Sequence, residues 1–324
     1  MTLSSSRPDF TICYPTYNRK DTITNRLHSI LASDYASSTN ILVSDNCSTD
    51  GTLERLKDFV GNDTIRVVQN TNYGSHFFGN IVNLFYECDT EWMVYMSDED
   101  EPLLGGIEQL FKHLADSSIP CDVVVGSVVK RDKVPGSVRN MPNRPLLFRD
   151  LYDNFTYLSG TVINRVSMRP VFDLMVSSYA KSKNEFLFYW PHVALIWAAY
   201  SRETLLGLPI PCASREEQVK SVLENHREDQ VVRWKALAGR WHKWIGSQDW
   251  MKDLSEESSF NGCKLEILDR MMLEHSRRMI TELEKGISYE RPEFTNIFSA
   301  AVMAECARKI SKMPWPSVQH SKAI

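Results

Sequence analysis

The chain has 324 residues, of which 43% are hydrophobic and 24% are charged, as in ordinary globular proteins. Its formal net charge of −4 and pI of about 6.1 exclude general affinity for nucleic acid, which needs clustered cations. The length fits one large α/β domain with an appendage or two domains of ordinary size. The seven cysteines are scattered and form no C-x-x-C pair, which indicates neither a disulfide framework nor a zinc site and favours a reducing compartment.

The two ends of the chain bear on its location. Met1 to Asp9 is polar and Ser-rich, and no stretch approaches the roughly 18 apolar residues of a membrane span. We therefore expect a cytoplasmic protein, at most peripheral to the inner face of a membrane. Residues 304–324 carry basic side chains around Trp315, which fits either contact with an anionic lipid surface or a solvated tail.

Strand-like and helix-like segments alternate through the first 130 residues. Strands are expected at 10–14, 41–43, 65–68, 92–96 and 123–129, and helices at 21–31, 52–60, 78–85 and 104–114. Asp21 is the expected N-cap of the first helix, and Pro102 is expected to end regular pairing after the fourth strand. This alternation predicts a mostly parallel sheet with right-handed crossovers, flanked by helices.

The later part of the chain changes in texture. An irregular basic loop over 130–145 precedes a strand at 158–163 and a helix around 171–179. An aromatic stretch, 184–192, follows it, and Pro191 suits the first turn of a helix that runs through Ala199. Beyond Ser214 the periodicity is helical, without recognisable strands.

Two carboxylates follow the apolar strand that starts at Trp92. Asp98 and Asp100 are one residue apart at a strand's carboxyl end, which is where ligands bind in open α/β sheets. Two hard oxygen ligands that face a common point suit Mg²⁺ or Mn²⁺. The alternative for an isolated D-x-D is a solvated acidic turn.

Two further strand ends carry polar motifs, Pro15-Thr16-Tyr17-Asn18 and Asp45-Asn46. Together with Ser97-Asp98-Glu99-Asp100, and in this order, they resemble glycosyltransferase family 2, a family of inverting enzymes with the GT-A fold. The resemblance covers the first 130 residues well and the next 80 loosely. It implies a Rossmann-like GT-A catalytic domain over 1–213, with a nucleotide-sugar half at about 8–130 and an acceptor half at about 131–213. Residues 214–324 form a helical region outside the resemblance.

The resemblance also implies roles for individual residues. Pro15, Thr16, Tyr17 and Asn18 border the nucleotide, Asp45 with Asn46 contacts the base, and Asp98 and Asp100 hold the ribose and a Mn²⁺ or Mg²⁺ ion. A carboxylate at position 45 can accept from an imide N–H, which favours a uridine-linked donor. The alternatives are a turn or helix-capping role for Asp45, and turn roles for Thr16 and Asn18.

The chain departs from the family in two places. Where relatives often have a basic residue that contacts the base or phosphate, the loop 72–80 offers only His76. Where relatives tend to show an acidic pair near the acceptor, the chain has the single Glu185. The loop 72–80 therefore lacks the basic residue that often contacts the diphosphate or base in relatives, and the acceptor side has one acid in place of a pair.

The catalytic base is expected late in the chain, because the D-x-D acids are occupied by ribose and metal. Glu185 precedes a helix, as the family's usual carboxylate does, and His192 is its rival because its intrinsic pKa suits proton transfer near neutral pH. Other acids that remain open are Asp150, Asp153 and Asp173.

The resemblance implies transfer of a sugar, with inversion, from a nucleotide-sugar donor to a glycan, a lipid-linked saccharide or a surface polymer. A nucleotidyltransferase is less favoured because no Gly-rich basic phosphate loop is present. A non-catalytic binding module is the third reading, and the intact Asp45, Asp98 and Asp100 argue against it. The C-terminal helices, with Trp234, Trp241 and Trp244, are expected to pack on the catalytic domain or on a second subunit.

Overall fold

The computed structural model describes residues 10–117, 119–130, 137–139, 141–147, 150, 157–215 and 246–275, and every structural statement below concerns these. Asp153, Trp234, Trp241, Trp244 and Trp315 lie outside them, so the expectations attached to these residues stay predictions.

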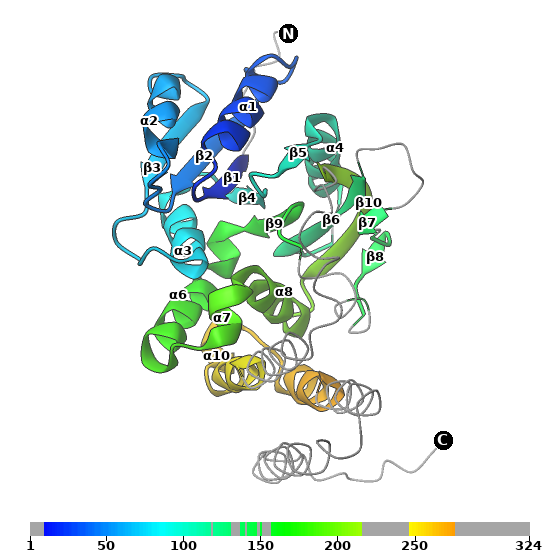
Figure 1. The fold of residues 1–324 in the computed structure, drawn as a ribbon. Helices are drawn as coiled ribbons and strands as arrows, with labels where there is room; N and C mark the ends of the chain where they lie inside the picture. Colours follow the sequence, from blue (N-terminus) through cyan, green and yellow to red (C-terminus); the bar gives the residue numbers. More distant parts are fainter. Residues whose placement is uncertain are drawn as a thin grey trace, which may run out of the picture.

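The first half of the chain alternates strands and helices as its hydrophobic pattern predicts (Figure 1). The elements are β1 (Phe10–Thr16), α1 (Lys20–Leu31), β2 (Asn40–Asp45), α2 (Thr52–Leu56), the 3₁₀ turn η1 (Lys57–Phe59), β3 (Ile65–Gln69), α3 (Phe77–Glu87), β4 (Trp92–Tyr95), β5 (Asp100–Pro102), α4 (Leu104–Asp116) and β6 (Val123–Lys130). The second half adds β7 (Ser137–Arg139), β8 (Arg144–Pro145), β9 (Thr161–Asn164), α6 (Arg165–Ser182), α7 (Glu185–Tyr189), α8 (Pro191–Ser201), β10 (Leu205–Arg215) and α10 (Ser258–Asn261).

The strands form one mixed sheet in the order β3-β2-β1-β4-β9-β6-β10-β5, with β7 beside β6 and β8 beside β10. Strands β3, β2, β1 and β4 are parallel, as are β6 and β10. Strand β9 runs antiparallel to both of its neighbours, and β5 runs antiparallel to β10. The expected sheet flanked by helices is therefore confirmed, with more antiparallel pairing than strict alternation predicts.

Both faces of the sheet are covered, because successive residues of a strand point to opposite sides. Cys13 and Met93 belong to the core beneath α3, α6, α7 and α8, whereas Ile12 and Val94 belong to the core beneath α1, α2 and α4. All four side chains are fully buried. The result is a three-layer arrangement with helices on both faces of the sheet.

One local expectation is wrong, and one strand was not predicted. Helix α1 begins at Lys20 after Arg19, so Asp21 lies in its first turn and is not the N-cap. Pro102 is the last residue of β5 and pairs with Ala213, so the pairing ends there as expected. An antiparallel edge position tolerates a proline when its missing N–H is not required. The chain beyond Ser201 also contains β10, which periodicity did not indicate and which runs past position 213.

Part of the helical C-terminal region packs on the rest of the protein. Residues 246–256 and 265–275 are helical, and Trp250 is fully buried in the core that includes α8. The Trp250 indole N–H donates to the carbonyl of Ala194 at 3.2 Å, and the Asn184 side chain donates to the carbonyl of Gly246 at 2.8 Å. These residues therefore pack against the preceding part of the chain, around α7 and α8.

A search of the described helices for a bilayer-crossing segment found none with both the length and the apolar composition required.

Candidate functional site

The carboxyl ends of the central strands bring the polar motifs together. Thr16 at the end of β1 is in register with Asp45 at the end of β2, and β4 ends beside β1, two residues short of Ser97. We call this border, which carries Thr16, Asp45, Asp98 and Asp100, the polar edge of the sheet. It is the position at which open α/β sheets bind ligands.

Asp45 is fully buried at the polar edge and is only half satisfied. Its Oδ2 accepts a hydrogen bond from the backbone N–H of Ser48 at 3.0 Å. Its Oδ1 is buried without a hydrogen-bond partner among the described residues. A buried carboxylate oxygen without a partner is costly, because it has lost water and gained nothing. The arrangement suits a ligand that brings its own N–H or O–H donor to Oδ1.

The loops after β1 and β2 hold each other in place. Asn18 has a positive φ of 52°, its N–H donates to the Ser48 hydroxyl at 2.8 Å, and its Oδ1 accepts from Thr49 N–H at 2.8 Å. Both of these contacts of Asn18 are turn contacts, while Tyr17 beside it is 49% exposed. The backbone N–H of Asn46 donates to the Thr16 carbonyl at 2.9 Å. These bonds fix the separation of the two loops.

Among the expected donor-site residues, Pro15 and Asn46 have structural contacts. Pro15 lies inside β1, opposite Ser44 of β2. The Asn46 side chain accepts from the amide of Asn70 at 2.9 Å, and Asn46 is buried. Tyr17 is thus the member of the first motif whose side chain is most open to a ligand.

Asn80 of α3 hydrogen-bonds to the ends of both β1 and β2, and the sequence analysis did not predict this role. The Asn80 amide donates to the carbonyls of Ser44 at 3.0 Å and Thr16 at 3.3 Å, and its Oδ1 accepts from the Ser44 hydroxyl at 2.5 Å. Asn83 completes the network by donating to the Ser44 hydroxyl at 2.8 Å. Two asparagines on one face of an otherwise apolar helix are the signal that predicts such a network.

Asp98 lies in the loop after β4 and turns toward β1. Its Oδ2 accepts a hydrogen bond from the Thr16 hydroxyl at 2.8 Å. Burial raises the pKa of Asp98 to about 6, although the Thr16 hydrogen bond and the nearby Arg19 cation act in the opposite direction. A positively charged partner would therefore lower the pKa of Asp98 and stabilise its ionised form in this buried environment.

Asp100 has a different surrounding. Its Oδ1 accepts from the Tyr157 hydroxyl and its Oδ2 accepts from the Ser159 hydroxyl, each at 2.5 Å. Ser159 also accepts the N–H of Ser97 at 2.9 Å, so it connects both ends of the D-x-D loop. Burial raises the pKa of Asp100, and the two hydroxyl hydrogen bonds oppose that rise. Each oxygen accepts one hydrogen bond and keeps a lone pair for a further partner.

A buried arginine holds the segment that carries Tyr157 and Ser159. Arg139 on β7 is 1% exposed and donates to the carbonyls of Gly126 at 3.0 Å, Tyr157 at 2.9 Å and Ser159 at 2.5 Å. Gly160 has a positive φ of 73°, and a Cβ there would lie 2.9 Å from the Arg139 guanidinium. The hydroxyls on Asp100 are therefore set by long-range contacts that no local motif encodes.

The donor set at the D-x-D fits a hard divalent cation, although the described residues contain no cluster of three or more His, Cys, Asp or Glu side chains that could hold a metal ion. Asp98 and Asp100 supply carboxylate oxygens, whose raised pKa values show that the protein alone does not compensate their charge. Mg²⁺ and Mn²⁺ are commonly held by one or two carboxylates, with water and phosphate oxygens completing the shell. The two residues would hold the ion on the protein side.

The two candidates for the base differ in access. Glu185 is exposed in the first turn of α7, where the buried Asn184 side chain caps the helix by accepting from Phe186 and Leu187 N–H. His192 is only 2% exposed in α8, and the edge of its ring faces Phe77 at 6.4 Å between centroids. A base must reach the acceptor hydroxyl, so the structure favours the accessible Glu185.

The other acids have partners elsewhere. Asp173 accepts from Tyr86 at 2.6 Å near the C-terminal end of α3, whereas the polar edge lies at the N-terminal end of that helix. Asp150 pairs with Arg144 at 2.7 Å, and β8, which carries Arg144, pairs with the start of β10. Neither acid lies at the polar edge.

His76, the only basic side chain in the loop 72–80, caps α3. Its Nδ1 accepts the N–H of Gly79 at 2.9 Å, and the ring lies 5.0 Å from Phe188 and 5.5 Å from Tyr179. Burial and the Lys183 charge lower the pKa of His76. His76 is therefore a neutral capping group at pH 7 and supplies no positive charge for a phosphate.

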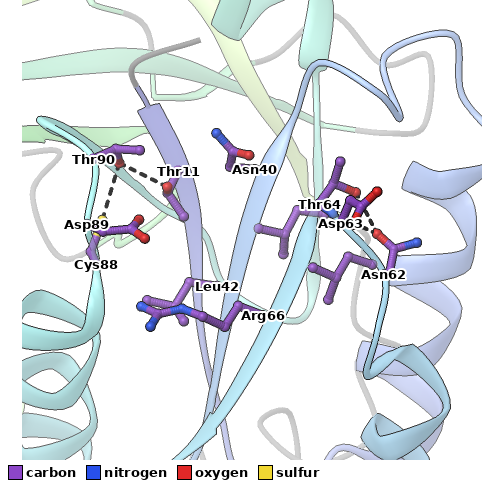
Figure 2. A pocket seen from close by; sticks show the side chains of 12 residues that line it. Thr11, Asn40, Leu42, Asn62, Asp63, Thr64, Arg66, Cys88, Asp89 and Thr90 are labelled. Atoms are coloured by element: carbon purple, nitrogen blue, oxygen red, sulfur yellow. Dashed lines mark hydrogen bonds between the residues drawn. The ribbon is translucent and has the colours of Figure 1, made fainter. Parts of the chain in front are cut away.

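A cleft of about 690 Å³ lies at the opposite edge of the sheet, where strands β1, β2 and β3 begin (Figure 2). Thr11 and Thr90 hydrogen-bond at 2.9 Å on one side of it, and Arg66 reaches into it from β3. None of the polar-edge residues lines this cleft. It is therefore separate from the candidate site.

Comparisons with solved structures show the class of fold. The chain matches S. aureus TarS residues 1–349 in complex with UDP with a TM-score of 0.59 at 14% identity, covering 93% of this chain and 80% of that one. The mannosyltransferase PcManGT from Pyrobaculum calidifontis matches at 16% identity and a TM-score of 0.47, covering 94% and 87%. Glucosyl-3-phosphoglycerate synthase from Mycobacterium tuberculosis matches at 12% and 0.46, covering 75% and 79%. The fold is that of the GT-A glycosyltransferases.

The sequence itself gives the family. The model of the family described as "Glycosyl transferase family 2" matches residues 11–172, half of the chain and all of the polar edge motifs. The protein belongs to this family. No curated protein matches the sequence.

Proposed function

We propose that the protein transfers a sugar, with inversion, from a uridine diphosphate-linked donor to a hydroxyl of a glycan, a lipid-linked saccharide or a surface polymer. The observation that carries the donor assignment is the buried Asp45 Oδ1, which lacks a hydrogen-bond partner among the described residues. Uracil offers an imide N–H that matches this acceptor. Family membership and the fold shared with TarS, which was solved with UDP, support the same class of donor.

Each part of the polar edge has a role in this reaction. Tyr17 and Asn18 border the nucleoside, and Asp98 takes the ribose side and, with Asp100, the metal ion. When bound, Mn²⁺ or Mg²⁺ offsets the negative charge that develops on the leaving diphosphate. Thr16 hydrogen-bonds to Asp98, and Tyr157 and Ser159 hydrogen-bond to Asp100, so each carboxylate is fixed by its own partners.

Glu185 is the proposed base. Inversion by a single displacement requires a group that removes the acceptor proton on the face opposite the leaving diphosphate. Glu185 is an exposed carboxylate on α7, and α7 packs against α3, whose N-terminal end reaches the polar edge. His192 is buried in α8 and takes no part in this proposal.

A thermal-shift panel tests the donor class, because only a ligand that prefers the folded state raises the unfolding midpoint. UDP with Mn²⁺ is expected to raise the midpoint, more than UDP in chelator and more than GDP with Mn²⁺. A response to GDP with none to UDP would contradict the uridine assignment.

Donor hydrolysis and transfer assays test the catalysis. Asp100→Ala is expected to abolish transfer while the unliganded midpoint stays within a few degrees of the wild type. Near-wild-type turnover of this variant in chelator would contradict the metal role. Nucleotide binding without any donor turnover in the wild-type protein would indicate a binding module.

A further inference from the structure

Four arginines among the described residues border the D-x-D loop, and three of them already interact with other protein groups. Arg19 pairs with Glu99 at 3.1 Å, and Arg26 lies 3.8 Å from Glu101. Arg139 is buried, and its guanidinium donates hydrogen bonds to three backbone carbonyls. Their positive charges are thus committed to holding the loop.

The fourth, Arg215, is placed differently. It ends β10 and lies directly opposite Asp100 in the antiparallel β5–β10 ladder, so the two Cα atoms are within roughly 5.5 Å. Its side chain is exposed, and its guanidinium carbon lies 5.5 Å from the centre of the Tyr157 ring. Among the described residues it has no hydrogen bond or ion pair, so none of them uses its five N–H donors.

Tyr157 links this cation to the metal-binding carboxylate. The face of its ring carries Arg215, and its hydroxyl donates to Asp100 Oδ1. The Arg215 charge is close enough to lower the pKa of Asp100, against the larger effect of burial. A group with two negative phosphates held at Asp100 through a cation would therefore lie beside the open guanidinium.

We propose that Arg215 binds the diphosphate of the nucleotide donor and stabilises its charge as the sugar leaves. This inference rests on the proposed function, and it supplies the cation that the loop 72–80 lacks. Guanidinium groups suit the task because they bind phosphate oxygens through two parallel N–H donors. Arg215 provides the N–H donors, and Tyr157 keeps the guanidinium at the polar edge.

The test compares ligands with and without the diphosphate. Affinities of UDP and uridine are measured by calorimetry for the wild type, Arg215→Ala and Arg215→Lys, in Mg²⁺ and again in chelator. Arg215→Ala is expected to weaken UDP about tenfold to hundredfold and to leave uridine unchanged. Arg215→Lys keeps the positive charge but lacks the paired N–H donors of a guanidinium. Its UDP affinity is expected to lie between those of the wild type and Arg215→Ala.

Arg66→Ala is the matched control. Arg66 is also an exposed arginine, with a side chain 47% accessible and a partner, Glu87, at 3.5 Å. It lies in the cleft at the opposite edge of the sheet, so its removal is expected to leave UDP affinity unchanged (Figure 2). The unliganded midpoint of each variant verifies folding.

Three outcomes are decisive. An equal loss of UDP and uridine affinity in Arg215→Ala would overturn the assignment, because the residue would then shape the site as a whole. Unchanged UDP affinity would overturn it as well. If the wild-type protein binds UDP no more tightly than uridine, the donor proposal itself fails, and this result requires no variant.

Discussion

The hydroxyl of Thr16 donates to Oδ2 of Asp98 at 2.8 Å and so joins two strand ends that are 82 residues apart in the sequence. This bond turns the Asp98 carboxylate toward β1, whereas the second carboxylate of the motif, Asp100, accepts from the hydroxyls of Tyr157 and Ser159. Asp98 and Asp100, which belong to one short motif, therefore accept hydrogen bonds from different parts of the chain. Both carboxylates keep a raised pKa because burial outweighs these hydrogen bonds.

Metal affinity is expected to fall as pH decreases through about 6. The pKa of Asp98 is raised to about 6, so below that pH the folded protein carries a proton where the cation must bind. Metal binding then has to release this proton, and the apparent Kd for Mn²⁺ is expected to rise about tenfold per pH unit below the pKa. Calorimetric titrations between pH 5 and pH 7.5 measure this slope. A Kd independent of pH would show that Asp98 is not a ligand.

The same linkage predicts the stability of the metal-free protein. A raised folded-state pKa means that protonation favours the folded state, so the Asp98 contribution is fully present below the unfolded pKa of about 3.9. It is lost as pH rises through about 6, where the folded carboxyl ionises in its buried position. Saturating Mn²⁺ is expected to stabilise the protein more at pH 7.5 than at pH 5.

Substitution of Thr16 tests the hydrogen bond directly. Thr16→Val removes the donor while keeping the branched shape, so the pKa of Asp98 is expected to rise further and the pH midpoint of Mn²⁺ binding with it. Thr16→Ser keeps the hydroxyl and is expected to retain the wild-type midpoint. Equal midpoints in both variants would show that the bond does not orient the carboxylate in solution.

Asp45→Asn is expected to change base preference. Ser48 N–H occupies Oδ2, so the carbonyl oxygen of the new amide would stay there and its NH₂ would take the place of Oδ1. An NH₂ group opposes the imide N–H of uracil but complements the acceptor N3 of cytosine. UDP affinity is expected to fall about tenfold to hundredfold, and the ratio of CDP to UDP affinity to rise. An unchanged ratio would place the base elsewhere.

The order of the polar motifs and the parallel half of the sheet follow from local pattern. Apolar runs of strand length end in Thr16, Asp45 and Asp98, and the carboxyl ends of parallel strands share one edge. The partners of Asp100 could not be predicted in this way. Tyr157 and Ser159 reach it through β9 and through the buried Arg139, and these contacts depend on tertiary packing over long separations.

Strand β10 was missed for a related reason. It carries Pro209 and Pro211, which argue against a strand interior, and it tolerates them through irregularities in its pairing with β6 between Leu208 and Ala213. Because β10 delivers Arg215 to Asp100, the missed strand also hid the candidate cation. Sequence periodicity predicts the regular strands of a sheet, but it does not predict strands that prolines and bulges interrupt.

The C-terminal segment is expected to be part of the folding unit. Trp250 is fully buried and its indole bonds to the Ala194 carbonyl of α8. Trp250→Ala is therefore expected to cost about 3–5 kcal/mol of unfolding free energy, measured by urea denaturation. Trp250→Phe, which keeps most of the volume, is expected to cost less. A truncation after Ala213 removes Trp250 together with the last two residues of β10. If the truncated protein stayed soluble and fully active, this prediction would be contradicted.

The final prediction separates Glu185 from His192 as the base. Removal of a general base lowers the rate of transfer about a hundredfold to ten-thousandfold with little loss of donor binding. Glu185 is exposed, so Glu185→Gln is expected to show this loss in kcat with unchanged UDP affinity and unfolding midpoint. His192 is 2% exposed, so His192→Ala is expected to leave a cavity, lower the midpoint and keep the rate within a few-fold below that temperature. If His192→Ala folds with a wild-type midpoint and loses transfer while Glu185→Gln remains active, the roles are reversed. If both variants turn over within a few-fold of the wild type, the base lies outside α7 and α8.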